Sequence, residues 1–96
     1  MTQEPTQEAP VVPRASVGHF ARLMERKLRE HDEDRGTDGW RGLECDVKYL
    51  LDRVIEEVEE LRSAFNDADR TRLVKESVDV ANFCMMITDR IDRPLQ

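Results

Sequence analysis

The stretch Glu56-Glu57-Val58-Glu59-Glu60 decides the fold, together with the similar stretch Glu76-Ser77-Val78-Asp79 that follows it. The first belongs to a run with helical apolar periodicity from about Leu43 to Phe65. The second belongs to another such run, from about Asp69 to Asp92. The sequence therefore predicts an all-α protein in which two consecutive helices each carry acids at regular spacing.

Each of these helices is expected to place an acid pair on its apolar face. Because an α-helix turns about 100° per residue, Glu57 and Glu60 share one face, as do Glu76 and Asp79. Glu57 falls inside the apolar stripe of its helix and Glu60 on the edge of that stripe. Their neighbours on those faces are Leu50, Val54, Leu61 and Ala64 on the first helix, and Val80, Phe83, Met86 and Ile87 on the second. A buried carboxylate costs several kcal/mol unless it is paired or bound to metal. The pattern therefore predicts a cation held between the helices. Glu59, in contrast to Glu57, falls on the solvated side of its helix.

Length, charge and cysteine use narrow the class of protein. Ninety-six residues form one small domain, and a net charge of −6 argues against binding to a nucleic-acid polymer. No stretch resembles a signal peptide or a membrane span. Cys45 and Cys84 lack a metal-binding spacing, and we interpret both as reduced thiols of a cytoplasmic protein.

The chain before the two acid-bearing helices has two parts. Residues 1–15 hold three of the four prolines and are predicted to form a disordered arm, and residues 16–96 form the helical domain. A first helix is expected from Ser16, as N-cap, to about His31. Its apolar stripe contains Val17, Phe20, Met24 and Leu28.

A glycine-rich loop follows over residues 32–42 and contains the only tryptophan, Trp40. Two interpretations remain open for this side chain: it plugs the core, or it forms a wall of a pocket where its flat face suits a nucleobase. His19 and His31 do not stand three residues after an acid. The Glu-x-x-His element of di-iron bundles is therefore absent, and both histidines are expected at the surface or its boundary.

Four motifs taken together carry a family resemblance. They are Phe20-x-x-x-Met24-x-x-Lys27-Leu28, Gly39-Trp40, Glu56-Glu57-x-x-Glu60-Leu61, and Glu76-x-x-Asp79-Val80-Ala81-Asn82-Phe83-x-Met85-Met86-Ile87. The chain resembles the MazG-like all-α nucleotide pyrophosphohydrolases over about residues 20–89, and among them the short, single-domain, often phage-borne members. The resemblance implies Mg²⁺-dependent hydrolysis of nucleoside triphosphates to monophosphate and pyrophosphate, with Mn²⁺ as a substitute ion.

The resemblance also implies roles for individual residues. The metal ligands would be Glu57, Glu60, Glu76 and Asp79. The catalytic acids would be Glu56, Glu57 and Glu60, of which Glu56 or Glu60 positions or deprotonates the attacking water. The nucleotide would be bound by Trp40, Lys27, Lys48 and Asn82, with Arg41 as a further basic group. Which basic residue contacts phosphate is left open.

Three helices of this length cannot surround a nucleotide and also bury all their apolar positions. A homodimer or homotetramer is therefore expected, located in the cytoplasm, or in the host cytoplasm if the chain is phage-encoded. The alternative hypothesis is a non-enzymatic helical interaction protein whose acidic face binds a basic partner and whose metal site is degenerate.

Overall fold

The computed structural model describes residues 9–42 and 45–93, and within them every regular element is helical. Three α-helices, α1 (Ala15–Arg35), α2 (Val47–Asn66) and α3 (Arg70–Asp92), are accompanied by a short 3₁₀ helix, η1 (Gly39–Arg41). The predicted all-α class is confirmed. No helix in the described ranges is both long and apolar enough to cross a membrane.

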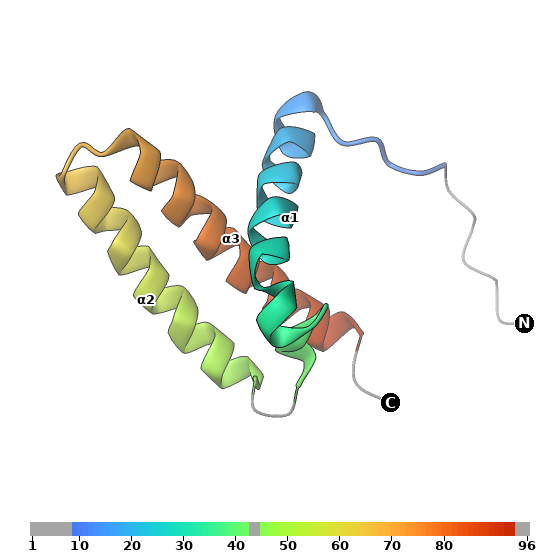
Figure 1. The fold of residues 1–96 in the computed structure, drawn as a ribbon. Helices are drawn as coiled ribbons and strands as arrows, with labels where there is room; N and C mark the ends of the chain where they lie inside the picture. The colour runs from blue at the N-terminus through green and yellow to red at the C-terminus, as the bar shows by residue number, and fades with distance from the viewer. Residues whose placement is uncertain (1–8, 43–44, 94–96) are drawn as a thin grey trace, which may run out of the picture.

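Helices α2 and α3 form an antiparallel hairpin and lie side by side along their lengths (Figure 1). Each begins at an aspartate that caps it: Asp46 accepts a hydrogen bond from the Tyr49 amide at 2.8 Å, and Asp69 accepts one from the Arg72 amide at 3.0 Å. The sequence allows either Asp67 or Asp69 to cap the third helix, and the structure shows that Asp69 does so. The expected start of the second helix at Leu43, which lies outside the described residues, is too early, because Asp46 is extended and the helix begins after it.

Helix α1 is longer at both ends than the sequence pattern predicted. It begins at Ala15, so Ser16 lies inside the helix and is not its N-cap; Arg14 precedes the helix without a side-chain cap. It runs past His31 through a polar segment and ends at Gly36, whose φ of 74° suits glycine and whose amide donates to the Asp32 carbonyl at 2.8 Å. Before the helix, residues 9–14 are extended and exposed.

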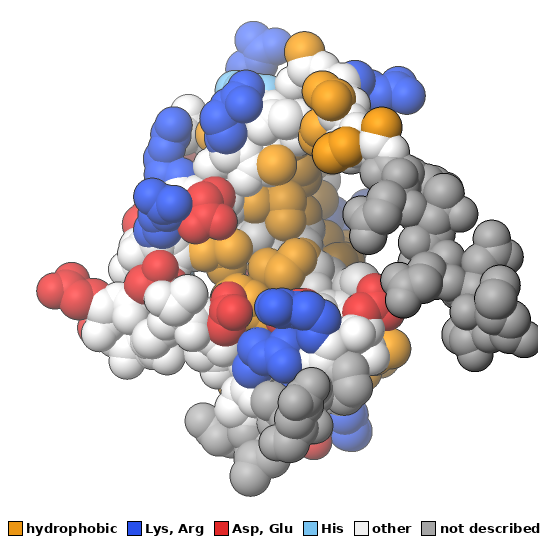
Figure 2. Space-filling view, turned by 90° about the vertical axis from the view of Figure 1, so that its right-hand side faces the viewer, with side chains coloured by type: hydrophobic (Ala, Val, Ile, Leu, Met, Phe, Trp, Pro, Cys, Tyr) orange, Lys and Arg blue, Asp and Glu red, His pale blue; other side chains and the backbone are white. Residues whose placement is uncertain are grey.

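The buried apolar core of the described chain is small. Only Leu50, Ala64 and Val78 are buried hydrophobic residues, and all three belong to the hairpin. Helix α1 lies across α3 and contributes no buried residue, so its apolar stripe is only half-buried, and Val17 at its start is exposed rather than packed (Figure 1). On one face of the molecule, hydrophobic side chains lie open in a hollow ringed by charged ones (Figure 2).

The glycine-rich loop is fixed to the end of α3 by hydrogen bonds to charged groups. The Asp89 Oδ2 atom accepts from Trp40 Nε1 and from Arg41 Nη1, both at 3.0 Å. In the reverse direction, Arg90 Nη1 donates to the carbonyl oxygens of Arg41 at 2.8 Å and Gly42 at 3.1 Å. These bonds hold Trp40 in one position against the hairpin.

Candidate metal centre and adjoining cleft

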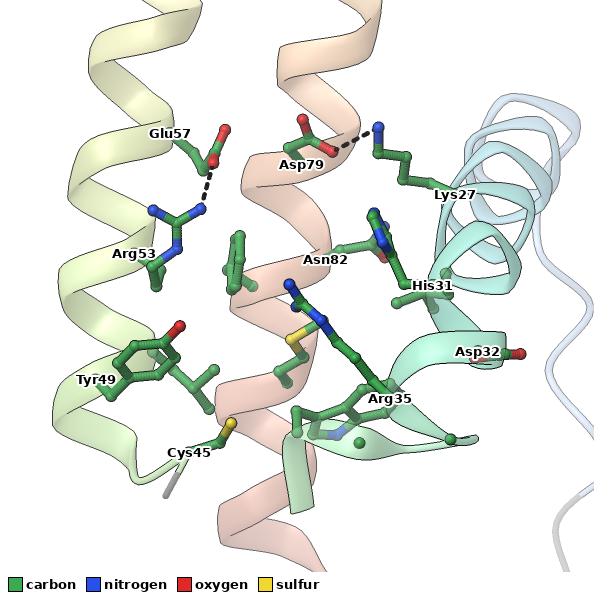
Figure 3. A pocket seen from close by; sticks show the side chains of 17 residues that line it. Lys27, His31, Asp32, Arg35, Cys45, Tyr49, Arg53, Glu57, Asp79 and Asn82 are labelled. Atoms are coloured by element: carbon green, nitrogen blue, oxygen red, sulfur yellow. Dashed lines mark hydrogen bonds and ion pairs between the residues drawn. The ribbon is translucent and has the colours of Figure 1, made fainter. Parts of the chain in front are cut away.

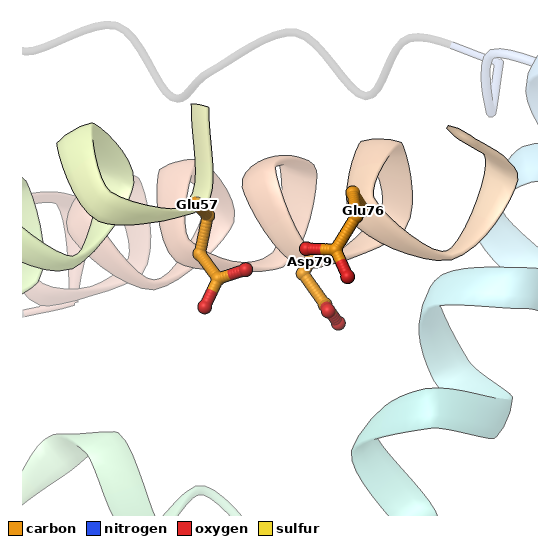
Figure 4. Close-up of side chains that lie close together, drawn as sticks. All are labelled: Glu57, Glu76 and Asp79. Carbon is orange, nitrogen blue, oxygen red and sulfur yellow. The ribbon is translucent and has the colours of Figure 1, made fainter. Parts of the chain in front are cut away.

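Three acids predicted to face inward meet at one point between α2 and α3. Glu57 comes from α2, and Glu76 and Asp79 come from α3; each offers a carboxylate oxygen, and these oxygens all lie within 4.8 Å of one another (Figure 4). Glu76 is buried, and the side chains of Glu57 and Asp79 are only 13% and 14% exposed. We call these three residues the acid triad. The prediction that they lie on a buried face is confirmed.

Basic side chains from all three helices lie close to the acid triad. Arg53 Nη2 on α2 lies 3.0 Å from Glu57 Oε1. Lys75 Nζ on α3 lies 3.2 Å from Glu76 Oε1 and 3.5 Å from Asp79 Oδ2. Lys27 Nζ on α1 lies farther away, 3.9 Å from Asp79 Oδ1.

The protonation of Glu57 reflects this crowding. Burial is the largest influence that raises the pKa of Glu57, followed by its contact with Glu76 and the charge of Asp79; Arg53 opposes them. Hydrogen bonding to Glu76 also raises the pKa of Lys75, so this lysine stays charged beside the triad. The site therefore favours extra positive charge.

Two further acids implied by the family resemblance lie outside this group. The Glu60 side chain is 60% exposed, and its Oε2 atom lies 3.7 Å from Arg72 Nη2. The Glu56 side chain is 59% exposed and accepts a hydrogen bond from Arg53 Nη1 at 2.5 Å. In the described part of the chain, three acids rather than four therefore come together, and roles for Glu56 and Glu60 stay predictions. Glu59 is exposed, as expected.

A cleft of about 290 Å³ adjoins the triad, with α1 on one side, α2 on the other and α3 at its floor (Figure 3). Glu57 and Asp79 lie at one end of it, and Trp40 also lines it. The rest of the lining is mixed in character: it includes the basic Lys27 and Arg53, the aromatic Tyr49 and Phe83, and the amide of Asn82.

Asn82 contributes an unsatisfied acceptor to this cleft. It is 4% exposed and follows Asp79 by one helical turn. Its Nδ2 donates to the Met24 carbonyl of α1 at 3.3 Å, while its buried Oδ1 has no hydrogen-bond partner among the described residues. Because an unpaired buried acceptor costs about 1–3 kcal/mol, a donor or cation supplied by a ligand would be favoured here.

Of the other residues predicted to bind the nucleotide, two line the cleft and two do not. Trp40 is half-buried, and its ring lines the cleft while its indole N–H is held by Asp89, so it is a wall rather than a buried plug. Lys27 lines the cleft. Lys48 does not; it is exposed and pairs with Asp52 at 2.9 Å. Arg41 binds Asp89 and the Arg93 carbonyl and does not line the cleft.

Sequence reasoning missed Arg53, although a signal for it was present. It precedes Glu57 by four residues, the spacing at which helical side chains pair. Asp89 was also missed, and its partners Trp40 and Arg41 lie 49 and 48 residues away, so no local pattern could have shown the contact.

The fold and the site together define an all-α protein with an acidic centre at the end of a cleft that basic, aromatic and apolar side chains line. The chain is 33% identical over 72 residues to an uncharacterised protein of Archaeoglobus fulgidus, an alignment that covers 75% of this chain and 77% of the relative. The chain belongs to the same family as this archaeal protein. No family model matches the chain. No solved structure matches it either.

Proposed function

We propose that this protein is a Mg²⁺-dependent nucleoside triphosphate pyrophosphohydrolase of MazG-like type, cleaving (d)NTP to (d)NMP and pyrophosphate. The observation that carries the proposal is the acid triad: carboxylates from two helices converge within 4.8 Å at the end of a cleft lined by an indole ring. Their donor chemistry suits a hard cation, because Mg²⁺ and Mn²⁺ prefer carboxylate oxygens, water and phosphate.

The proposed ligands are the three triad acids, and the exposed Glu60, one turn from Glu57, would act through water because Mg²⁺ keeps several waters when bound. When bound, the ion would supply charge neutralisation and Lewis acidity at the phosphate chain. Glu56 and Glu60 are exposed carboxylates on the same helix as Glu57, and one of them would accept a proton from the attacking water.

The cleft also supports a nucleotide substrate. With the triphosphate at the acid triad, Lys27 would lie on the neighbouring α1 wall, and the Trp40 ring in the cleft lining would offer a flat surface for a base. A volume of about 290 Å³ falls at the lower limit of pockets that hold small ligands, typically about 300–1,000 Å³. A second copy that extends the walls would complete the cleft.

An unpartnered face of α2 supports assembly into a homodimer or a dimer of dimers. Five apolar side chains lie within about 80° on this helix and are exposed: Val47, Leu51, Ile55, Val58 and Phe65.

Light scattering should give the wild type a mass of two or four chains of 11.2 kDa each. Ile55→Glu should reduce the mass toward that of one chain because it puts a charge on this stripe; a wild-type mass of 11.2 kDa at high concentration would overturn the assembly.

The activity itself is tested by pyrophosphate release from the common NTPs and dNTPs, with and without Mg²⁺. Glu57→Gln and Glu76→Gln should abolish release, because each keeps the side-chain shape and removes a ligand charge. Glu59→Gln is the matched control on the same helix, exposed and outside the triad, and should retain activity. Near wild-type rates in both triad variants would contradict the proposed site.

One observation favours the alternative, a non-enzymatic interaction protein. Each triad acid already has a basic partner within 4 Å, as expected for a structural ion network. In that case the protein would bind neither Mn²⁺ nor nucleotide, and the triad-to-glutamine variants would change only stability.

A further inference from the structure

The basic side chains around the acid triad are not equivalent. Lys75 contacts two of the acids but does not line the cleft. Lys27 lines the cleft, but its Nζ atom lies 3.9 Å from Asp79, beyond a good hydrogen bond. Only Arg53 combines a 3.0 Å contact to the triad with a place in the cleft wall (Figure 3).

We infer that Arg53 is an exchangeable counter-ion, which holds Glu57 in the ion-free protein and passes to the phosphate oxygens of the bound ligand when a divalent cation takes Glu57. This inference rests on the proposed function and assigns a phosphate-binding residue to the same site.

The contacts of Arg53 allow this exchange without loss of its position. Its second nitrogen, Nη1, is held by Glu56, which is exposed and not part of the triad. Its guanidinium also lies over the Phe83 ring, 5.1 Å from the ring centre, in a cation–π contact. When Glu57 turns to a cation, these two contacts still hold the guanidinium beside the Phe83 ring, and the Nη2 edge becomes free.

A free guanidinium edge is the group best suited to a phosphate chain. Its planar donors match two oxygens of one phosphate, a geometry that lysine does not offer. The same step removes a positive charge from the Glu57 oxygen that the divalent cation needs. Cation binding and anion binding at this site are therefore coupled through one side chain.

The coupling predicts opposite effects of one substitution on two ligands. Arg53→Gln should strengthen binding of Mn²⁺ alone several-fold, measured from the free-ion signal by electron paramagnetic resonance, because it removes the competing cation. In saturating Mn²⁺, the same variant should bind inorganic pyrophosphate roughly tenfold or more weakly by calorimetry, because a charge-assisted hydrogen bond is lost.

Two further variants make the test specific. Lys75→Gln removes the same charge from the triad outside the cleft, so it should strengthen Mn²⁺ binding and leave the affinity for pyrophosphate at the wild-type value. Arg53→Lys keeps the charge and loses the planar fork, so Mn²⁺ binding should stay near wild type while pyrophosphate binding weakens. This variant also serves if Arg53→Gln does not fold, which circular dichroism would show.

The outcomes separate this inference from the proposed function. If wild type binds Mn²⁺ and hydrolyses nucleotides, but both Arg53 variants bind pyrophosphate as wild type does, Arg53 is not the phosphate residue and the proposed function stands. If Arg53→Gln weakens Mn²⁺ binding, Arg53 supports the site instead of competing for it, and the exchange is wrong. A wild-type protein that binds no Mn²⁺ would overturn both.

Discussion

Removing one charge from the acid triad should stabilise the ion-free protein. At an effective dielectric constant of about 20, two unit charges 4.8 Å apart repel by about 3.5 kcal/mol, so Glu57 meets about 7 kcal/mol from Glu76 and Asp79. The attraction to Arg53 at 3.0 Å returns about 5.5 kcal/mol. Glu57→Gln should therefore raise the free energy of unfolding in EDTA at pH 7, by at most about 1–2 kcal/mol from these charges because Lys75 offsets part of the repulsion. Relief from burying the charge acts in the same direction.

The stability difference between Glu57→Gln and the wild type should depend on pH, and the direction of this dependence follows from the pKa of Glu57. Burial and the neighbouring carboxylates raise the pKa of Glu57 above its ordinary 4.5 in the folded state. The ionised group therefore destabilises the fold above the folded-state pKa, and this penalty disappears as the pH falls below 4.5. The advantage of the glutamine variant should shrink between pH 7 and pH 4.

Excess divalent cation should reverse the order of the two proteins. An ion at 100 times its dissociation constant adds about 2.7 kcal/mol to the wild type, which exceeds the charge relief in the variant. Urea unfolding followed by circular dichroism, in EDTA and in Mn²⁺, measures both differences. A variant less stable than wild type in EDTA at pH 7 would refute the reasoning, since it would mean that the Arg53 pair outweighs the repulsion.

Three other outcomes are expected from the fold and the cleft. A non-hydrolysable triphosphate with Mg²⁺ should change the fluorescence of Trp40, the only tryptophan, and an unchanged spectrum at saturation would remove it from the binding site. Asp89→Asn should lower the melting temperature and shift the Trp40 emission in the ligand-free protein, because it weakens the acceptor of the indole N–H; a spectrum identical to wild type would argue against that anchor. Leu50 is only 1% exposed, and Leu50→Ala should lower the free energy of unfolding by about 3 kcal/mol. This value is at the lower end of the range for buried leucines because Leu50 borders the cleft, so its removal leaves no sealed cavity. The control Val74→Ala, at an exposed position, should be nearly silent.

The sequence predicted most reliably what depends on helical periodicity. The inward direction of Glu57, Glu76 and Asp79 follows from the apolar residues around them; the structure buries Glu76 and leaves the side chains of Glu57 and Asp79 only 13% and 14% exposed. Periodicity placed Glu60 at the edge of the same stripe, where a rotation of a few tens of degrees decides between core and solvent. Its exposure depends on how closely α2 and α3 approach, which no local pattern contains.

Element ends and long-range contacts were harder to predict, for different physical reasons. The end of α1 was placed at His31 because apolar periodicity stops there, but a polar helical turn needs no apolar face and the helix continues to Arg35. The anchoring of Trp40 by Asp89 joins residues 49 apart in the sequence. That contact exists only once α3 has packed behind the loop.

The attachment of α1 gives the two sides of the cleft different dynamics. This helix has no buried residue, and a hydrogen bond from Asn82 to the Met24 carbonyl joins it to the hairpin. Local opening is governed by the buried contacts that a segment makes, so backbone amides of α1 should exchange with solvent deuterium well before those beside Leu50 and Val78. The wall that carries Lys27 can therefore swing away while the hairpin stays folded, and a bulky ligand can enter the cleft without global unfolding.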